Sequence, residues 1–246
     1  MNYLQVIFLG VLQGLTEFLP VSSSGHLVIA QSLMSGFDQP GVLFDVVLHL
    51  ATAVAIVIYF RERLLNLGLR EAGLLVAGSV PVLIVGLTAR SSVESLFSSV
   101  TVVGLALILT AGLNFMTDRA TGRRQMMGWV DAVFVGVFQA MAIVPGLSRS
   151  GSTIFAGTVM GVDRKKAAEF SFLLSVPAIV GASLLEVISH GFQGGSGVGI
   201  YIVGFFVSLF ASVIGIGLMM RVLTERRFKY FAGYCLVVGL GVLLFL

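Results

Sequence analysis

The feature that most limits the fold of this chain is a series of apolar stretches with very little polar sequence between them. They cover residues 3–19, 26–35, 42–60, 72–89, 98–116, 129–144, 150–161, 167–189, 198–220 and 228–246. Only 11% of the 246 residues are charged, whereas soluble domains average about 25%. The sequence therefore predicts an all-α polytopic membrane protein that forms one integral domain over residues 1–246.

Two of these stretches, 26–35 and 150–161, are too short to cross a bilayer, which takes about 20 helical residues. Each follows a polar tip, PVSSSGH at residues 20–26 and PGLSRSGST at residues 145–153. Non-helical backbone at membrane depth is tolerated only where protein buries it or where it lines a watery cavity. We interpret residues 3–35 and 129–161 as re-entrant helical hairpins that carry these tips.

The two hairpins resemble each other in sequence. LGVLQGLTEFLPVSSSGHLVIA at residues 9–30 aligns without gaps with VGVFQAMAIVPGLSRSGSTIFA at residues 135–156. The duplication gives a first half over residues 1–120 and a second half over residues 127–246, each with one re-entrant hairpin and three transmembrane helices. Because three is odd, the second half is inverted, and such inverted-topology repeats bind polar ligands near the midplane.

The basic residues indicate the orientation. Thirteen of the 15 Lys and Arg residues fall in loops on one side of the predicted topology: Arg61, Arg63, Arg70, Arg119, Arg123, Arg124, Arg164, Lys165, Lys166, Arg221, Arg226, Arg227 and Lys229. Arg90 is alone on the other side, and Arg149 lies at a tip. By the positive-inside rule both termini lie outside. The net charge of +3 therefore reports topology and predicts no nucleic-acid partner.

The second tip has the composition of an anion site. Gly146 permits a tight turn, and Ser150 or Ser152 is expected to cap the following helix, whose N-terminus then faces the tip. Together with the guanidinium of Arg149, this end favours phosphate. The expected hydrogen-bond donors to phosphate are Ser148, Ser150 and Thr153. The alternative is a capped helix with Arg149 reaching to the membrane interface, but arginine inside an apolar hairpin is usually functional.

The first tip offers hydroxyls at Ser22, Ser23 and Ser24, followed by His26. Ser22 and Ser24, like Gly146 in the second tip, are also expected to contact the phosphate. Either a serine hydroxyl or the imidazole can serve as nucleophile, and His26 can instead act as acid or base. We favour Ser23, because its partner in the repeat is Arg149 and the two tips are expected to face each other. The alternative is an ordinary polar cap with a buried, hydrogen-bonded histidine.

Glu17 lies one helical turn after Gln13, so both are expected on one helix face. A carboxylate beside a bound phosphate is repelled unless it coordinates Mg²⁺ or takes a proton from the nucleophile. For Gln13, substrate contact and interhelical hydrogen bonding remain equally open. For the pair Asp45 and His49, support of the site and simple polarity at a helix start also remain equally open.

LQGLTEFLPVSSSGH and VPGLSRSGST closely resemble the two signatures of the undecaprenyl-diphosphatase (bacitracin-resistance) family of bacterial membrane phosphatases. The resemblance implies an integral enzyme that hydrolyses undecaprenyl diphosphate to undecaprenyl phosphate and inorganic phosphate, recycling the lipid carrier of cell-wall synthesis. It places the acidic motif on Gln13 and Glu17, and the phosphate-binding arginine on Arg149. It places the serine-rich turn on Ser22 and Ser23 and the essential histidine on His26. The glutamine at position 13 leaves a single carboxylate in the acidic motif.

The predicted partner is a prenyl diphosphate lipid, held between helices in the bacterial cytoplasmic membrane, and the site is expected to open to the outer face. Mg²⁺ is the expected cofactor, with Glu17 as its candidate ligand. A transporter or flippase of the lipid phosphate is the rival hypothesis, because inverted repeats are common in transporters. A carrier, however, needs no nucleophile beside an acid or base. A homodimer remains open.

Overall fold

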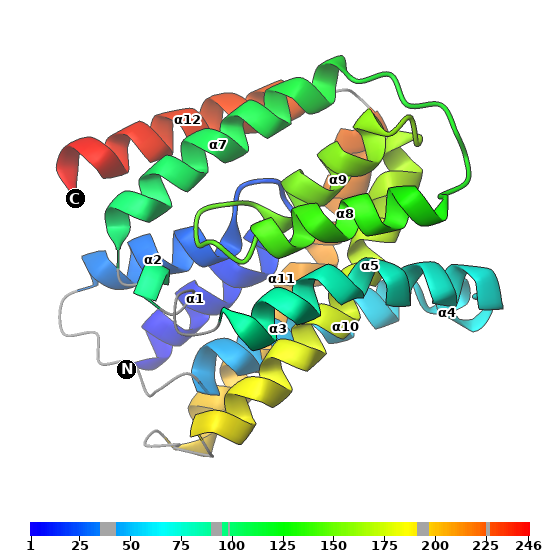
Figure 1. Cartoon of the computed structure of the whole chain (residues 1–246). Coiled ribbons are helices and arrows are strands. Elements are labelled where there is room, and N and C mark those ends of the chain that lie inside the picture. The colour runs from blue at the N-terminus through cyan, green and yellow to red at the C-terminus, as the bar shows by residue number, and fades with distance from the viewer. Residues whose placement is uncertain (35–42, 90–94, 98, 191–196, 225–226) are drawn as a thin grey trace.

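The computed structural model describes residues 1–34, 43–89, 95–97, 99–190, 197–224 and 227–246, and regular structure in these ranges is helical. The labelled helices, shown in Figure 1, are α1 (Tyr3–Thr16), α2 (Ser23–Leu33), α3 (Leu43–Tyr59), α4 (Arg61–Leu65), α5 (Leu69–Thr88), α7 (Val100–Arg119), α8 (Trp129–Met141), α9 (Arg149–Val159), α10 (Arg164–His190), α11 (Val198–Thr224) and α12 (Phe228–Phe245). Every one of the ten predicted apolar stretches therefore contains a helix.

Five helices in the described ranges, α5, α7, α10, α11 and α12, are long and apolar enough to cross a membrane. A sixth predicted span, α3, has 17 described residues, the lower end of the range for spanning helices. By contrast, α2 and α9 have 11 residues each, which is about 16 Å at 1.5 Å per residue and too short to span. The predicted polytopic membrane protein is confirmed.

The helices are arranged so that both termini lie at one end of the molecule. Figure 1 shows the N- and C-termini at the left, whereas α4 and the 120–128 segment lie at the opposite, right-hand end. That right-hand end carries most of the basic residues that fixed the predicted orientation. Arg90 and Arg226, which also entered that prediction, lie outside the described residues.

Glycines let the short hairpins lie directly against long helices. Helix α1 packs on α11, where a Cβ added to Gly14 would lie 2.5 Å from the Ser208 carbonyl oxygen. Helix α8 packs on α5 in the same way, since a Cβ on Gly136 would lie 2.2 Å from the Gly78 carbonyl oxygen. Small residues that allow backbones to touch are typical of packing between membrane helices. Each hairpin is therefore fixed by backbone contact to one long helix.

A buried aromatic cluster closes the bundle on the basic side of the hairpin tips. Its largest members are Phe18, Phe60, Phe172 and Phe228, and Ile56, Ile216 and Met219 fill the space between them. The rings of Phe18 and Phe172 meet edge to face, with centroids 5.5 Å apart. Because Phe18 directly follows Glu17, this packing fixes the backbone of the first tip next to that carboxylate.

Candidate active site

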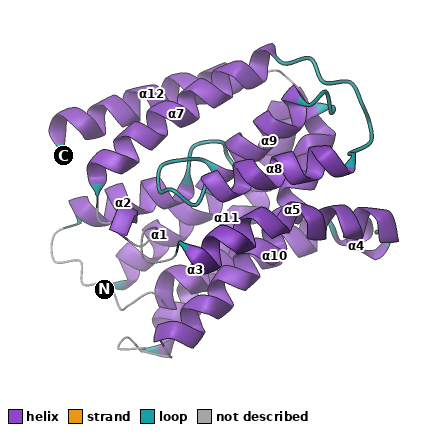
Figure 2. Ribbon diagram, viewed as in Figure 1, coloured by secondary structure: helices purple, strands orange, loops and turns teal. Residues whose placement is uncertain are grey.

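The loops that join α1 to α2 and α8 to α9 lie in the interior of the bundle, between its two ends (Figure 2). The helix after each loop is capped at the tip by a serine. The Ser22 hydroxyl accepts a hydrogen bond from the Gly25 backbone N–H at 3.3 Å, and the Ser148 hydroxyl accepts one from the Gly151 N–H at 3.1 Å. The N-termini of α2 and α9 therefore both face the tips.

The prediction that Ser150 or Ser152 caps α9 was wrong, because Ser148 is the N-cap. The capping side chain must precede the helix and reach the N–H three residues later, a position that only Ser148 occupies. Ser150 instead donates a hydrogen bond to the Leu19 carbonyl oxygen at 3.1 Å. It thereby joins the second tip to the first.

The two tips are in direct backbone contact. A Cβ added to Gly25 would lie 2.8 Å from the Cα of Gly146, closer than real side-chain carbons approach. Gly146 has φ +93, which a side chain would strain, and a Cβ there would also meet the Val103 carbonyl oxygen at 2.4 Å. The predicted tight turn at Gly146 and the predicted meeting of the two tips are both confirmed.

Glu17 is the centre of a polar cluster between the tips. Its Oε1 accepts a hydrogen bond of 2.6 Å from Arg149, and its Oε2 accepts one of 2.6 Å from the Ser23 hydroxyl. Gln13 donates a third hydrogen bond to Oε2 at 3.0 Å. Glu17 is only 8% exposed, so the guanidinium is needed to compensate its charge in this poorly solvated position. The cluster brings a hydroxyl, a carboxylate and a guanidinium together.

Arg149 keeps one donor group uncommitted. Its NH2 group bonds Glu17, while its NH1 group is buried and has no hydrogen-bond partner among the described residues. A buried, unpaired donor on a charged group is costly unless something accepts from it. An anion such as phosphate would supply the missing acceptor and would match the fork of the guanidinium.

His26 lies beside this cluster, with its ring nitrogens bound elsewhere. Nδ1 lies 2.7 Å from the Ser22 carbonyl oxygen, which can only accept, so Nδ1 carries the proton and donates the hydrogen bond. Nε2 lies 2.8 Å from the hydroxyl of Tyr234 on α12, and the two rings are stacked. In the neutral imidazole Nε2 therefore accepts from Tyr234. A catalytic role for His26 stays a prediction, and it requires Nε2 to exchange the Tyr234 hydroxyl for substrate or water.

The remaining predicted phosphate ligands hold the tips in shape. The Thr153 hydroxyl donates to the Arg149 carbonyl oxygen at 2.7 Å and is 2.6 Å from the Ser171 hydroxyl. The Ser24 hydroxyl is partly exposed and lies 3.4 Å from that of Ser22. Contact of these hydroxyls with phosphate also stays a prediction.

His49 belongs to the site, although the sequence left its role open. Its Nε2 lies 3.9 Å from Oε2 of Glu17, and its Nδ1 is bound to the Asp45 carbonyl oxygen at 2.8 Å. The signal was the Asp45–His49 spacing, which places both on one helix face. Tyr234 was missed altogether, because a tyrosine in an apolar helix carries no comparable signal.

The protein side chains alone do not form a complete Mg²⁺ site of the kind predicted. Among the described residues, no three His, Cys, Asp or Glu side chains are grouped closely enough to hold a metal ion. Both oxygens of Glu17 are already bound by Arg149, Ser23 and Gln13. A divalent ion at this site would therefore take most of its ligands from phosphate oxygens of the substrate.

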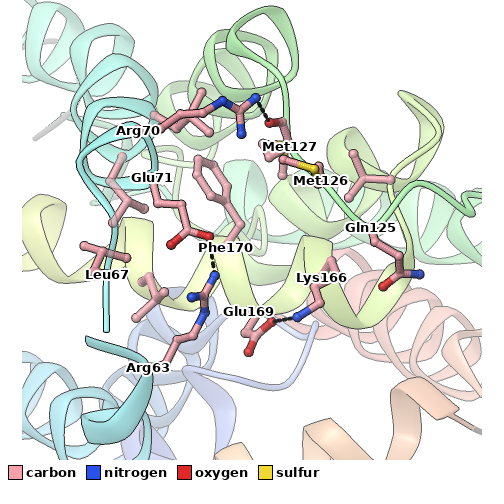
Figure 3. Close-up of a pocket in the computed structure, with 14 residues that line it drawn as sticks. Arg63, Leu67, Arg70, Glu71, Gln125, Met126, Met127, Lys166, Glu169 and Phe170 are labelled. Carbon is pink, nitrogen blue, oxygen red and sulfur yellow. Dashed lines mark hydrogen bonds and ion pairs between the residues drawn. The ribbon is translucent and has the colours of Figure 1, made fainter. Parts of the chain in front are cut away.

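A separate cavity of about 90 Å³ lies near the basic end of the bundle, away from the tips (Figure 3). Its wall contains the ion pair of Arg63 with Glu71 and that of Lys166 with Glu169, the latter 2.9 Å long. The hydrogen bond to Glu71 raises the pKa of the Arg63 guanidinium. Because the charged groups of these pairs satisfy one another and no tip residue lines this cavity, it is not the candidate active site.

Known proteins resemble this chain over almost its whole length. The family model described as "Bacitracin resistance protein BacA" matches residues 6–241. A protein of Syntrophotalea carbinolica named "Undecaprenyl-diphosphatase" is 41% identical over 256 residues, which cover 97% of this chain and 97% of that protein. Proteins of the same name from Carboxydothermus hydrogenoformans and Desulfosudis oleivorans are 39% and 41% identical, and the matches cover 99% and 100% of this chain. They cover 97% and 99% of those two relatives.

Proposed function

Because this chain belongs to the bacitracin resistance protein BacA family, we propose that it hydrolyses undecaprenyl diphosphate to undecaprenyl phosphate and inorganic phosphate. The relatives that match almost its whole length carry the name of this activity. The observation that carries the proposal is the contact of Glu17 with both Ser23 and Arg149. It joins a nucleophile, its base and an anion-binding group at one buried point.

In the bound state, Arg149 NH1 and the N-termini of α2 and α9 hold the terminal phosphate of the substrate. The prenyl chain extends between helices into the lipid, where its burial costs nothing because both surroundings are apolar. The arrangement fits phosphoryl transfer, because such reactions are accelerated mainly by positioning and by stabilising charge on the transferred group.

In the first step, Ser23 Oγ attacks the terminal phosphorus while its proton passes to Glu17 Oε2, the atom that already accepts its hydrogen bond. A bond forms between Oγ and phosphorus, and the bond from phosphorus to the bridging oxygen breaks. Undecaprenyl phosphate leaves with that electron pair. Arg149 stabilises the negative charge that moves onto the oxygens of the transferred group.

In the second step, water attacks the phosphoserine, the Oγ–phosphorus bond breaks, and Ser23 regains its proton from Glu17. Inorganic phosphate is released and the site returns to its starting state. His49 Nε2 lies 3.9 Å from the same carboxylate oxygen. His26 is the alternative nucleophile or base, as the family resemblance implies.

A carrier of the lipid phosphate receives no support from the comparisons, because the relatives described above are named as diphosphatases. The Ser23–Glu17 contact also has no purpose in a carrier, which binds its substrate and releases it unchanged.

The two hairpins are proposed to be re-entrant and to enter the membrane from opposite faces, as in an inverted repeat. Two observations support this topology. Helices α2 and α9 are too short to span, and Figure 1 shows α1 beginning at the end with the termini whereas α8 begins at the opposite end. The setting is the bacterial cytoplasmic membrane, with both termini outside.

The site is proposed to open to the outer face. Polar side chains of Gln31, Asp45 and His49 are partly exposed and lead from the outer end of α3 towards Glu17. On the other side of Glu17, the aromatic cluster around Phe18 is buried. A charged headgroup therefore meets polar groups from outside and apolar packing from inside.

The decisive experiment is phosphate release from a C55 or shorter prenyl diphosphate by the purified protein in detergent. Steady release in buffer is expected, and its absence with all tested prenyl diphosphates would contradict the proposal. A parallel reaction with chelator and added Mg²⁺ tests the cofactor. If Mg²⁺ is required to neutralise the charge of the diphosphate, chelator should stop release and added Mg²⁺ should restore it. Unchanged release in chelator would show that Arg149 and the helix N-termini are sufficient.

A further inference from the structure

Two polar side chains on α7, Thr110 and Asn114, connect this helix to both tips. They lie one helical turn apart and are 1% and 0% exposed, so neither has access to water. Helix α7 belongs to neither hairpin, and no motif of the sequence pointed to it. Each of these side chains bonds the backbone of a different tip.

The hydroxyl of Thr110 is both a donor and an acceptor of hydrogen bonds with the backbone of the second tip. The hydroxyl donates a hydrogen bond of 2.9 Å to the Gly146 carbonyl oxygen and accepts one of 2.9 Å from the Ser148 N–H. Ser148 is the residue immediately before Arg149. The backbone on which the phosphate-binding arginine is mounted is therefore fixed to α7 on both sides of Leu147.

Asn114 holds the first tip in the same manner. Its Nδ2 donates a hydrogen bond of 2.6 Å to the Pro20 carbonyl oxygen, three residues before Ser23. Its Oδ1 would lie 3.0 Å from a Cβ added to Gly151, so the amide is wedged between the first tip and α9. The thiol of Cys235 on α12 approaches the same Pro20 carbonyl at 3.7 Å, a weak second contact.

We propose that Thr110 and Asn114 are positioning residues that set the separation between the nucleophile tip and the phosphate-binding tip. Thr110 and Asn114 are four residues apart, a rise of about 6 Å along α7, and this fixed distance separates the two attachment points. The proposal rests on the proposed function, because it assigns a purpose to this spacing in phosphoryl transfer. A shift of about 1 Å in such a geometry can reduce turnover about a hundredfold.

Thr117, on the same helix, is a buried threonine whose hydroxyl bonds neither tip. It is fully buried, and its hydroxyl donates to the Leu113 carbonyl oxygen of its own helix at 2.8 Å. Buried threonines in apolar helices commonly satisfy themselves in this way. Thr110 bonds across 36 and 38 residues of sequence instead. Thr117→Val therefore provides a matched control that removes one buried hydroxyl without touching a tip.

The test compares Thr110→Val, Thr110→Ser and Thr117→Val with the wild-type enzyme in the phosphate-release assay. For Thr110→Val, kcat should fall about tenfold to a hundredfold while KM changes less than about threefold, because the arginine is displaced but not lost. Thr110→Ser keeps the hydroxyl and should restore most of kcat. Thr117→Val should stay within about twofold of the wild type. Thermal unfolding of the same samples separates loss of stability from loss of positioning.

Equal kcat values for Thr110→Val and Thr117→Val would overturn the proposal, as would a Thr110→Ser enzyme no better than Thr110→Val. If Thr110→Val is not monodisperse, Thr110→Ala replaces it with the same expectation.

On the first tip, Asn114→Leu should lower kcat as Thr110→Val does, whereas Cys235→Ala should not. An inactive wild-type protein would contradict the proposed function. The role of α7 would then be tested independently of activity, by cysteine cross-linking that measures how close the two tips lie in each variant. In that measurement, cross-linking of Ser24→Cys with Leu147→Cys, both in a Cys235→Ala background, should decrease when Thr110→Val is added.

Discussion

Arg149 donates a hydrogen bond of 2.6 Å to Oε1 of Glu17, from the tip of one hairpin to the end of the first helix of the other. The pair compensates the charge of the buried Glu17 with that of the partly buried Arg149 when no substrate is bound. Arg149 NH1 has no hydrogen-bond partner among the residues that the structure describes, so the proposed phosphate would bind there without first breaking the ion pair. The ion pair uses Oε1 and the Ser23 hydroxyl uses Oε2, so in the proposed mechanism anion binding and deprotonation of Ser23 involve different oxygens of Glu17.

Replacing Arg149 should remove both functions of this pair. Arg149→Ala is expected to abolish phosphate release, because the charge that develops on the transferred group loses its main compensation. Arg149→Lys should rescue little, since an ammonium group cannot contact Glu17 and phosphate with the two arms of a planar fork. Steady-state kinetics on monodisperse protein provide the measurement. Near-normal kcat in Arg149→Ala would remove Arg149 from the site.

Replacing Glu17 should leave binding intact and stop proton transfer. Glu17→Gln keeps the size of the side chain, and turnover should fall at least about a hundredfold, the lower range for an acid or base. The matched control is Glu62→Gln on the exposed helix α4, which should behave as wild type. Glu17→Gln protein that still binds substrate but fails to turn it over separates chemistry from folding. Loss of folding with activity would indicate a structural role.

Ser23 and His26 are distinguished by parallel alanine variants. Since the Ser23 hydroxyl already donates to Glu17 and His26 bonds Ser22 and Tyr234, Ser23→Ala should remove the nucleophile. His26→Ala should slow turnover about a hundredfold if the family role holds, and Tyr234→Phe should then show whether Tyr234 orients the ring. Trapping of a phosphoserine by rapid quench would identify Ser23 directly. If Ser23→Ala retains most of its activity, the nucleophile is His26 or water.

The close contact of the tips predicts a steric effect at Gly25. A Cβ there would meet backbone atoms of Gly146 at 2.8 and 3.1 Å, and backbone cannot move aside as a flexible side chain does. Gly25→Ala is therefore expected to push the tips apart and reduce kcat by at least about a hundredfold. Gly112→Ala on α7 is the control, because a Cβ there meets nothing within 4 Å. Equal activities of the two variants would mean that the tips are not held in contact.

The helices were predictable from the sequence because the membrane requires long apolar runs and each run contains a helix in the structure. The repeat also paired Ser23 with Arg149, and both indeed contact Glu17. What could not be predicted depends on hydrogen bonds between distant segments. The partner of His26 lies 208 residues away, and that of Asn114 lies 94 residues away.

The incorrect cap at α9 has a local cause. PGLSRSGST contains four hydroxyl side chains in nine residues, and each has the chemistry of a cap. Which one caps depends on where the helix begins, and helix boundaries are set by the tertiary contact of Gly146 and Ser148 with Thr110. The sequence pattern thus located the second tip but did not assign the hydrogen bond that each hydroxyl in it makes.

The proposed opening of the site to the outer face leads to a labelling prediction. Ser24 is partly exposed at the first tip, and the one native cysteine, Cys235, is buried. A Ser24→Cys protein in a Cys235→Ala background should therefore react with a membrane-impermeant thiol reagent in intact cells, and substrate or pyrophosphate should protect it. Phosphate release must first show that the background is active, because Cys235 approaches the Pro20 carbonyl of the same tip. Labelling that occurs in inverted vesicles alone would place the mouth on the cytoplasmic side. The phosphatase chemistry would be unaffected, since the Glu17, Ser23 and Arg149 contacts do not depend on which face admits the substrate.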